Sequence, residues 1–156
     1  MKTKTQLDQL RSSLWRLFLT AHTRLLERME EKLVQADLPP LEWYDVLFSL
    51  KEAPNHQLRL SELAQKVLLS RSNLTRLVDR LERANLLCRQ SCPNDRRGTY
   101  AVLTPAGLAM QEQMWSVYSE AIEEYFAAYV DDSEAEVLQQ VLKRLLAAAE
   151  QNANDD

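Results

Sequence analysis

The sequence has few of the residues that build loops, cross-links and membrane spans. Of its 156 residues, 2 are glycine and 2 are cysteine. So little glycine argues against a loop-rich or all-β architecture, and two cysteines are too few for a disulfide framework. The longest uninterrupted apolar runs, residues 125–130 and 145–149, are far shorter than the roughly 20 residues that span a bilayer. We therefore expect a mainly helical protein with reduced thiols and no membrane span.

Motifs of enzymes, metal sites and exported proteins are also missing. The sequence has no glycine-rich phosphate loop, no His-x-x-x-His pattern, and no Ser or Cys with an identifiable base. Its two histidines and two cysteines stand at scattered positions that match no metal-ligand spacing. The basic N-terminal residues are not followed by an apolar segment, so a secretory signal is not expected. We predict a cytoplasmic protein that is not an enzyme and uses no metal or cofactor.

Charge is unevenly distributed along the chain. The formal net charge is −4, but residues 59–97 contain nine basic and four acidic residues, against 10 basic and 19 acidic residues elsewhere. A basic segment in an otherwise acidic chain concentrates positive potential on one surface. This asymmetry favours one docking orientation on a polyanion. The alternative is a solvated charged surface on which the clustering is accidental.

The basic segment contains the pattern of a helix-turn-helix. Apolar spacing predicts a helix over residues 60–67 with Ser61 as its N-cap, a turn at Leu68-Leu69, and a second helix capped by Ser70. One face of the second helix is apolar, with Leu74, Leu77, Val78 and Leu81 at helical spacing. The opposite face carries Ser72, Arg76, Asp79, Arg80 and Arg83, with Asn73 and Thr75 beside them. A solvated helix usually carries balanced Glu and Lys pairs instead, so this face indicates a helix that enters a DNA major groove.

A β-hairpin is predicted directly after this helix. Asn85 stands where a left-handed residue is needed, residues 86–91 and 99–103 have strand patterns, and residues 93–98 form the turn. A helix-turn-helix followed by a hairpin is a winged helix. The hairpin tip carries three charged residues, Asp95, Arg96 and Arg97. We expect the aspartate to brace Arg97 while the loop enters a minor groove, where negative potential favours arginine.

Long helices are predicted at both ends of the chain. Apolar residues recur at spacings of three and four from Leu7 to Leu33, and a helix that begins at Thr104-Pro105 runs to about Val130. A capping box at residues 133–136 opens a last helix with a leucine stripe. These helices carry more apolar surface than a compact winged module covers, and a second copy of the chain is the simplest partner. We expect one domain over residues 1–156, with a winged lobe at about 41–104 and dimerisation helices at about 1–38 and 105–150.

Several short motifs stand in the order and spacing of a known family. They are residues 75–82 (TRLVDRLE), residues 85–87 (NLL), and residues 95–97 (DRR) followed by residues 103–107 (LTPAG). From Leu41 onward the sequence therefore resembles the MarR family of winged-helix transcription regulators. Asn85 stands where the family usually has Gly, and Ala101 where it often has a β-branched residue. Both departures are physically mild.

The resemblance implies a homodimer that places two winged lobes on a pseudo-palindromic operator in double-stranded DNA. Its recognition-helix positions are Arg71, Ser72, Asn73, Thr75 and Arg76, and its wing pair is Asp95 and Arg97. Family members commonly repress neighbouring genes and release DNA on sensing an oxidant or a small, often phenolic, molecule. We predict a sequence-specific, ligand-responsive repressor. The alternatives are a winged-helix module that binds proteins and a constitutive DNA binder without effector response.

Individual DNA contacts follow from side-chain chemistry. Phosphate contacts from Ser61, Arg80 and Arg83 would supply most of the affinity and its dependence on salt. The side chains expected to contact base edges are Ser72, Asn73, Thr75 and Arg76. Arginine is the best partner for guanine O6 and N7, whereas a wing arginine responds to the width of the minor groove.

The resemblance places an effector site between the dimerisation helices and the winged lobe. The candidates there are Trp15, Arg16, His22, Trp43, Tyr44 and Trp115. Aromatic residues at helical spacing are more often core residues, and His22 is more often an interface residue than an acceptor for a phenol. Cys88 and Cys92 on one strand would lie about 13 Å apart, too far for a disulfide between them. An exposed, reactive thiol at Cys92, near the wing arginines, is the remaining route to oxidant sensing.

Overall fold

The computed structural model describes residues 6–69 and 71–154, and for residues 95–97 and 154 it describes the backbone only. In chain order the elements are α1 (Gln9–Gln35), α2 (Leu41–Glu52), η1 (Pro54–His56), β1 (Gln57–Arg59), α3 (Leu60–Lys66), η2 (Arg71–Asn73), α4 (Leu74–Arg83), β2 (Leu87–Cys92), β3 (Asp95–Leu103), α5 (Pro105–Tyr125), η3 (Ala127–Tyr129) and α6 (Asp132–Asn154). The three η elements are single turns of 3-10 helix. The predicted class, mainly helical with a small β wing, is confirmed.

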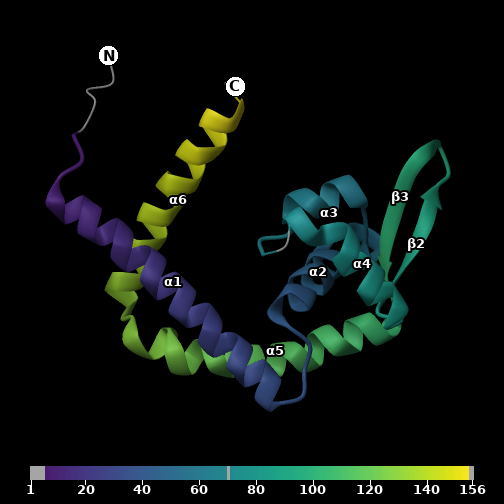
Figure 1. Cartoon of the computed structure of the whole chain (residues 1–156), viewed down its shortest axis with the longest axis horizontal. Helices are drawn as coiled ribbons and strands as arrows, with labels where there is room; N and C mark the ends of the chain where they lie inside the picture. The colour runs from purple at the N-terminus through teal and green to yellow at the C-terminus, as the bar shows by residue number, and fades with distance from the viewer. Residues whose placement is uncertain (1–5, 70, 155–156) are drawn as a thin grey trace.

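The molecule has a winged lobe on one side and helical arms on the other (Figure 1). Helices α2, α3 and α4 and the strands form the lobe, while α1 and α6 extend away from it (Figure 1). The long helix α5 runs beneath both parts and joins them (Figure 1). Among the described residues, no helix has the combination of length and apolarity needed to cross a membrane.

Apolar faces of the three lobe helices meet in one core. Leu47 and Leu50 of α2 and Leu63 of α3 are fully buried. From α4, the four positions predicted to face inward are all buried: Leu74, Leu77, Val78 and Leu81. The helical period of 3.6 residues therefore identified the inner face of α4 correctly.

The turn after α4 also follows the prediction. Asn85 has a φ of 62°, in the left-handed region that asparagine tolerates better than most residues. The next amide, of Leu86, donates to Leu81 O at 3.0 Å, and the Asn85 amide donates to Glu82 O at 2.9 Å. These bonds satisfy carbonyls at the helix end and turn the chain into β2.

The sheet has three antiparallel strands in the order β1-β3-β2. The sequence patterns indicated only a two-stranded hairpin, because β1 has three residues and is too short to show an alternating pattern. Strand β3 also begins earlier than predicted: Asp95 already pairs with Cys92, so Pro93 and Asn94 alone form the turn. The backbone of residues 95–98 therefore belongs to the strand and not to a loop.

Three predicted helix boundaries are wrong, and for α3 and α6 the reason is a competing cap. Helix α3 begins at Leu60, because Glu62 accepts from the Arg59 amide at 2.9 Å, so Ser61 lies inside the helix and does not cap it. Helix α6 is capped by Asp131 and Glu134, two residues earlier than the predicted box at 133–136. Helix α5 ends at Tyr125, short of Val130, and the chain continues as the turn η3.

The start of α5 packs tightly on the end of α4. Thr104 caps α5 by accepting from the Gly107 amide at 3.0 Å, and its hydroxyl donates to Asn85 O at 2.7 Å. A Cβ placed on Gly107 would lie 1.9 Å from Leu86 O. Only glycine permits this approach, so Gly107 fixes how closely α5 joins the lobe.

The C-terminal half of α1 anchors the arm to α5. Met29 and Leu33 are buried in the core, and Lys32 Nζ lies 2.7 Å from Glu124 Oε2 and 5.5 Å from the centre of the Tyr125 ring. The ion pair lowers the pKa of Glu124 and raises that of Lys32. By contrast, all described side chains from residue 6 to residue 24 are exposed.

Candidate nucleic-acid interface and adjoining cavity

The outer surface of η2 and α4 carries polar and basic side chains. The exposed members are Ser72, Thr75, Arg76, Arg80 and Arg83, while Asn73 is half-buried. Within the described part of the chain, none of the three α4 arginines forms an ion pair with an acidic side chain. Three uncompensated cations on one helix face attract a polyanion.

Arg71 takes a different role from the α4 arginines. Its Nη2 donates to Gln65 O at 3.0 Å, and its Nε lies 3.4 Å from Val67 O. The guanidinium therefore satisfies carbonyl groups at the C-terminal end of α3. In this structure Arg71 ties η2 to α3, with its donors directed at the protein backbone.

The wing is fastened to α4 by an arginine of β2. Arg89 Nη2 lies 2.5 Å from Asp79 Oδ1, and Arg89 Nη1 lies 2.9 Å from Glu82 Oε1. The Arg89 amide also donates to Glu82 Oε2 at 2.8 Å. Burial opposes the charge of Arg89, but the hydrogen bonds to the two carboxylates outweigh it and raise the pKa of the guanidinium. Both acids of α4 thus bond to Arg89 and not to the arginines of α4, and the single positive charge of Arg89 offsets part of theirs.

Some predicted DNA contacts lie outside the described residues. They are the side chains of Asp95, Arg96 and Arg97, whose backbone alone is described, and the predicted helix cap at Ser70 also lies outside the described residues. Ser61 is exposed in the first turn of α3, on the same lobe.

A cavity of about 750 Å³ lies between α1, α2, α5 and the turn that follows α3. Aromatic rings form much of its wall: Tyr44 stacks on Trp115 with ring centres 6.1 Å apart and meets the edge of Tyr118 at 5.1 Å. Phe48 also stacks on Tyr44, with ring centres 5.7 Å apart. Such a cavity suits a flat aromatic molecule.

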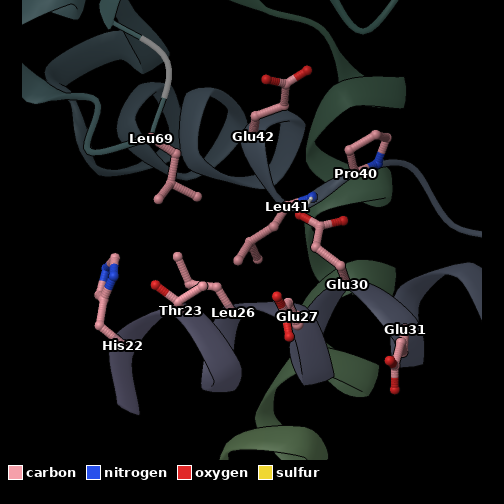
Figure 2. A pocket seen from close by; sticks show the side chains of 10 residues that line it. All are labelled: His22, Thr23, Leu26, Glu27, Glu30, Glu31, Pro40, Leu41, Glu42 and Leu69. Carbon is pink, nitrogen blue, oxygen red and sulfur yellow. Dashed lines mark hydrogen bonds between the residues drawn. The ribbon is translucent and has the colours of Figure 1, made fainter. Parts of the chain in front are cut away.

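A second cavity of about 630 Å³ adjoins the first. The two share His22, Leu26, Leu41 and Leu69, and Figure 2 shows α1 side chains facing Leu41 and Leu69 across the gap. Glu30 on this wall accepts from the Leu41 amide at 2.9 Å. Burial raises the pKa of Glu30, the Leu41 bond opposes the rise, and the charge of Glu42 adds to it.

Two buried polar residues line the aromatic cavity. Asp45 Oδ2 accepts from the amides of Leu68 and Leu69 at 2.6 and 2.9 Å. Gln111 Nε2 lies 3.5 Å from the Tyr44 hydroxyl, and Gln111 Oε1 has no hydrogen-bond partner in the described part of the chain. Burial raises the pKa of the Tyr44 phenol, so this ring is neutral and offers its hydroxyl as a donor.

With this geometry, the chain is similar to bacterial transcriptional regulators. The profile of the MarR family matches residues 41–99. The HTH-type transcriptional repressor MdtR of Bacillus subtilis (strain 168) is 30% identical over 151 residues, which cover 96% of this chain and 92% of that protein. The chain belongs to the MarR family.

Other transcriptional regulators are similar to this MarR-family chain over nearly its whole length. The HTH-type transcriptional regulator MhqR of B. subtilis (strain 168) is 27% identical over 86% of the chain and 90% of that protein. Sco3205 of Streptomyces coelicolor, a MarR family transcriptional regulator solved in complex with DNA, superposes with a TM-score of 0.85. It is 25% identical, over 95% of this chain and 92% of Sco3205. These relatives are regulators and not enzymes, as the sequence predicted for this MarR-family chain.

The structure brings together three of the six candidate effector residues. His22, Tyr44 and Trp115 line the aromatic cavity. Trp15 and Arg16 lie on the exposed first half of α1, away from the cavity. Trp43 is half-buried, packs against the core and does not line the cavity.

Several residues of the cavity wall were missed. Tyr118 and Gln111 lie on α5, seven positions apart and on the same face as Trp115 at helical spacing; that spacing was the available signal. For Asp45 no local signal exists, because its partners are 23 and 24 positions away.

The two thiols are less exposed than oxidant sensing would require. Cys92 is 6% exposed, so the expectation of an exposed thiol beside the wing is wrong. The pairing of β2 with β3 is irregular between Ser91 and Cys92, and such an irregularity changes the direction of a side chain at the end of a strand. Cys88 is half-buried.

Proposed function

We propose that this MarR-family chain is a homodimeric, sequence-specific repressor that binds a pseudo-palindromic operator and responds to a small aromatic molecule. The observation that carries the proposal is the row of exposed arginines along α4, namely Arg76, Arg80 and Arg83, which form no ion pair with an acid of the described residues. The DNA complex of Sco3205 supports double-stranded DNA as the polyanion.

We assign base contacts to the exposed N-terminal part of this face. Thr75 and Arg76 stand in the first turn of α4, and Ser72 and Asn73 stand in η2 just before it. Arg80 and Arg83, one and two turns further on, are assigned to phosphates together with Ser61. The wing residues Asp95, Arg96 and Arg97 are assigned to the minor groove. Arg71 can join the base contacts only by leaving the α3 carbonyls that it now binds.

The exposed arms support a homodimer through residues of about 1–38 and 105–150. On α1, Leu10, Leu14 and Leu17 are 75%, 59% and 65% exposed. Along residues 132–153 every side chain except the half-buried Val141 is exposed, including Leu145 and other leucines. A helix with an uncovered apolar stripe gains its stability from packing, and a second copy supplies the matching stripe.

The aromatic cavity supports an effector site. It combines stacked ring walls with two buried polar groups, Gln111 and the Tyr44 hydroxyl, which is the composition of small-molecule sites. It also touches Leu68 and Leu69 of the helix-turn-helix. We assign the effector contacts to His22, Tyr44 and Trp115, with Tyr118 added.

DNA binding is tested by fluorescence anisotropy with duplexes from the gene's own upstream region and a scrambled duplex of equal composition, each at several salt concentrations. We expect tight, sequence-selective binding that weakens steeply as salt rises. Equal, weak binding to every duplex, repeated in a genome-wide selection, would instead assign the lobe to a protein partner.

The dimer is tested by sedimentation equilibrium of Leu14→Asp against Ser13→Asp. Both substitutions add a charge to exposed positions on α1, but only Leu14 belongs to the apolar stripe. We expect the first variant to dissociate and the second to remain dimeric. Monomeric wild-type protein at micromolar concentration would contradict the proposed assembly.

A further inference from the structure

The helix-turn-helix is held from behind by a carboxylate of another helix. Asp45 on α2 is 9% exposed. One of its oxygens, Oδ2, accepts from the backbone amides of Leu68 at 2.6 Å and Leu69 at 2.9 Å. These two residues connect α3 to the turn η2 that leads into α4. A single side-chain atom thus joins the lobe core to the segment that sets where α4 begins.

Among the described residues, few other contacts fix this connection. The Leu68 side chain is 82% exposed and that of Leu69 is 41% exposed, so neither is held by burial in the core. Charge-assisted bonds to a carboxylate are roughly twice as strong as neutral ones. Removing the acceptor leaves two backbone N–H groups without their partner. The turn then depends on the contact of Arg71 with α3.

We propose that Asp45 is a positioning residue for DNA binding: its carboxylate holds the turn between α3 and η2 where the exposed face of α4 can meet a duplex. Asp45 itself lies on α2, within the wall of the aromatic cavity, and does not belong to the predicted interface. This proposal rests on the proposed function, because the role assigned to Asp45 is to support DNA binding.

The test compares Asp45→Ala, Asp45→Asn and Ser49→Ala. Asparagine keeps an oxygen that can accept from both amides, whereas alanine does not. Ser49 is the matched control, because its hydroxyl donates to the Asp45 carbonyl at 2.7 Å on the same helix without touching the turn. If Asp45→Ala does not fold, Asp45→Ser replaces it, since a serine hydroxyl is too short to reach both amides.

We expect Asp45→Ala to bind the operator duplex about tenfold or more weakly, as the loss of a charge-assisted bond predicts. Asp45→Asn should recover most of that loss, and Ser49→Ala should bind like wild type. Amide NMR gives a readout independent of DNA: the Leu68 and Leu69 amide protons should move upfield and exchange faster in Asp45→Ala, and stay unchanged in Ser49→Ala.

Two results would overturn the inference while leaving the proposed function intact. One is wild-type DNA affinity in a folded Asp45→Ala protein. The other is an Asp45→Asn protein that loses as much affinity as Asp45→Ala, because the acceptor would then be irrelevant. A wild-type protein that bound no duplex in any assay would overturn the proposed function, and this inference with it.

Discussion

The guanidinium of Arg89 on β2 and the carboxylate of Asp79 on α4 lie 2.5 Å apart. The contact joins the wing to the helix that carries the basic face, and Glu82 completes it with a second bond to Arg89 at 2.9 Å. The relative orientation of wing and helix is therefore set by side chains that have no DNA role of their own. In the proposed complex a duplex meets both elements at once, so this orientation would decide whether both can bind.

Arg89→Ala should weaken binding to operator and scrambled duplexes alike. We also expect a melting temperature lower by up to about 4 °C, since a partly exposed ion pair contributes about 0.2–1 kcal/mol. Anisotropy and thermal denaturation measure the two effects. Arg28→Ala is the control, because it removes an ion pair with Glu31 inside α1. Unaltered DNA affinity in the Arg89 variant would show that the brace has no part in binding.

Arg76→Ala should reduce specific binding by about 1–3 kcal/mol and relax the preference at one base pair of each half-site. The side chain is exposed in the first turn of α4 and can bond two acceptors of a guanine. Competition binding against a library of single-base operator variants measures the preference. Arg24→Ala removes an equal charge from α1 and should leave the preference unchanged. Wild-type discrimination by Arg76→Ala would remove Arg76 from the base contacts.

Gly107→Ala should destabilise the fold by about 1–3 kcal/mol, the usual cost of overpacking. The added methyl group would lie 1.9 Å from Leu86 O and 2.7 Å from the Leu103 side chain, so α5 must shift away from the lobe. Ala106→Ser adds one heavy atom at the exposed neighbouring position and serves as the control. Chemical denaturation at fixed protein concentration measures the free energy of unfolding of both variants and wild type. Equal stability of Gly107→Ala and wild type would contradict the close approach of Gly107 to Leu86 O.

Glu30 should make stability fall as the pH rises above its ordinary pKa of 4.5. Burial raises the pKa of this carboxyl in the folded protein, so the folded state holds the proton more tightly than the unfolded state and loses that advantage as the pH passes the raised value. Glu30→Gln keeps an acceptor for the Leu41 amide without the titration. The melting temperature of wild type relative to Glu30→Gln should therefore decline over this range. A constant difference from pH 4 to pH 7 would contradict the prediction, and exposed Glu112→Gln is the control.

Gln111→Leu should stabilise the protein by about 1 kcal/mol, because a buried polar atom without a partner costs about 1–3 kcal/mol. Gln111 is 2% exposed, and its Oε1 has no partner among the described residues. The same change should weaken binding of aromatic ligands that carry a hydrogen-bond donor, measured by calorimetry. Met114→Leu, a buried change without a polar group on the same helix, should do neither. A destabilised Gln111→Leu protein would mean that the amide has a structural partner.

The regular spacing of apolar residues predicted which face of a helix is buried. The buried positions of α4 follow the helical period, and the polar face opposite them was identified by the same rule. The start of α6 was missed because Asp131 and Ser133 each precede a glutamate by three positions. Both pairs fit a capping box, and only the structure shows that Asp131 forms it.

The cavity could be predicted only in part, for a different physical reason. Tyr44 and Trp115 were identified as aromatic candidates, but aromatic side chains in cores and in sites look the same in sequence. Asp45 was missed because its function depends on amides more than 20 positions away. Strand β1 has only three residues and is stabilised by its hydrogen bonds to β3. Because β3 is distant in the sequence, the residues around β1 carry no pattern that predicts this pairing.

Substitutions on the buried face and on the exposed face of α4 differ in their cost in folding free energy. Its leucines hold the lobe together, whereas Thr75 and Arg76 project from it and are exposed. Substitution of the projecting residues costs little folding free energy, since surface changes are usually within about 0.5 kcal/mol. If these residues make the proposed base contacts, one copy can acquire a new operator after gene duplication by changing a few codons while the inherited scaffold stays intact.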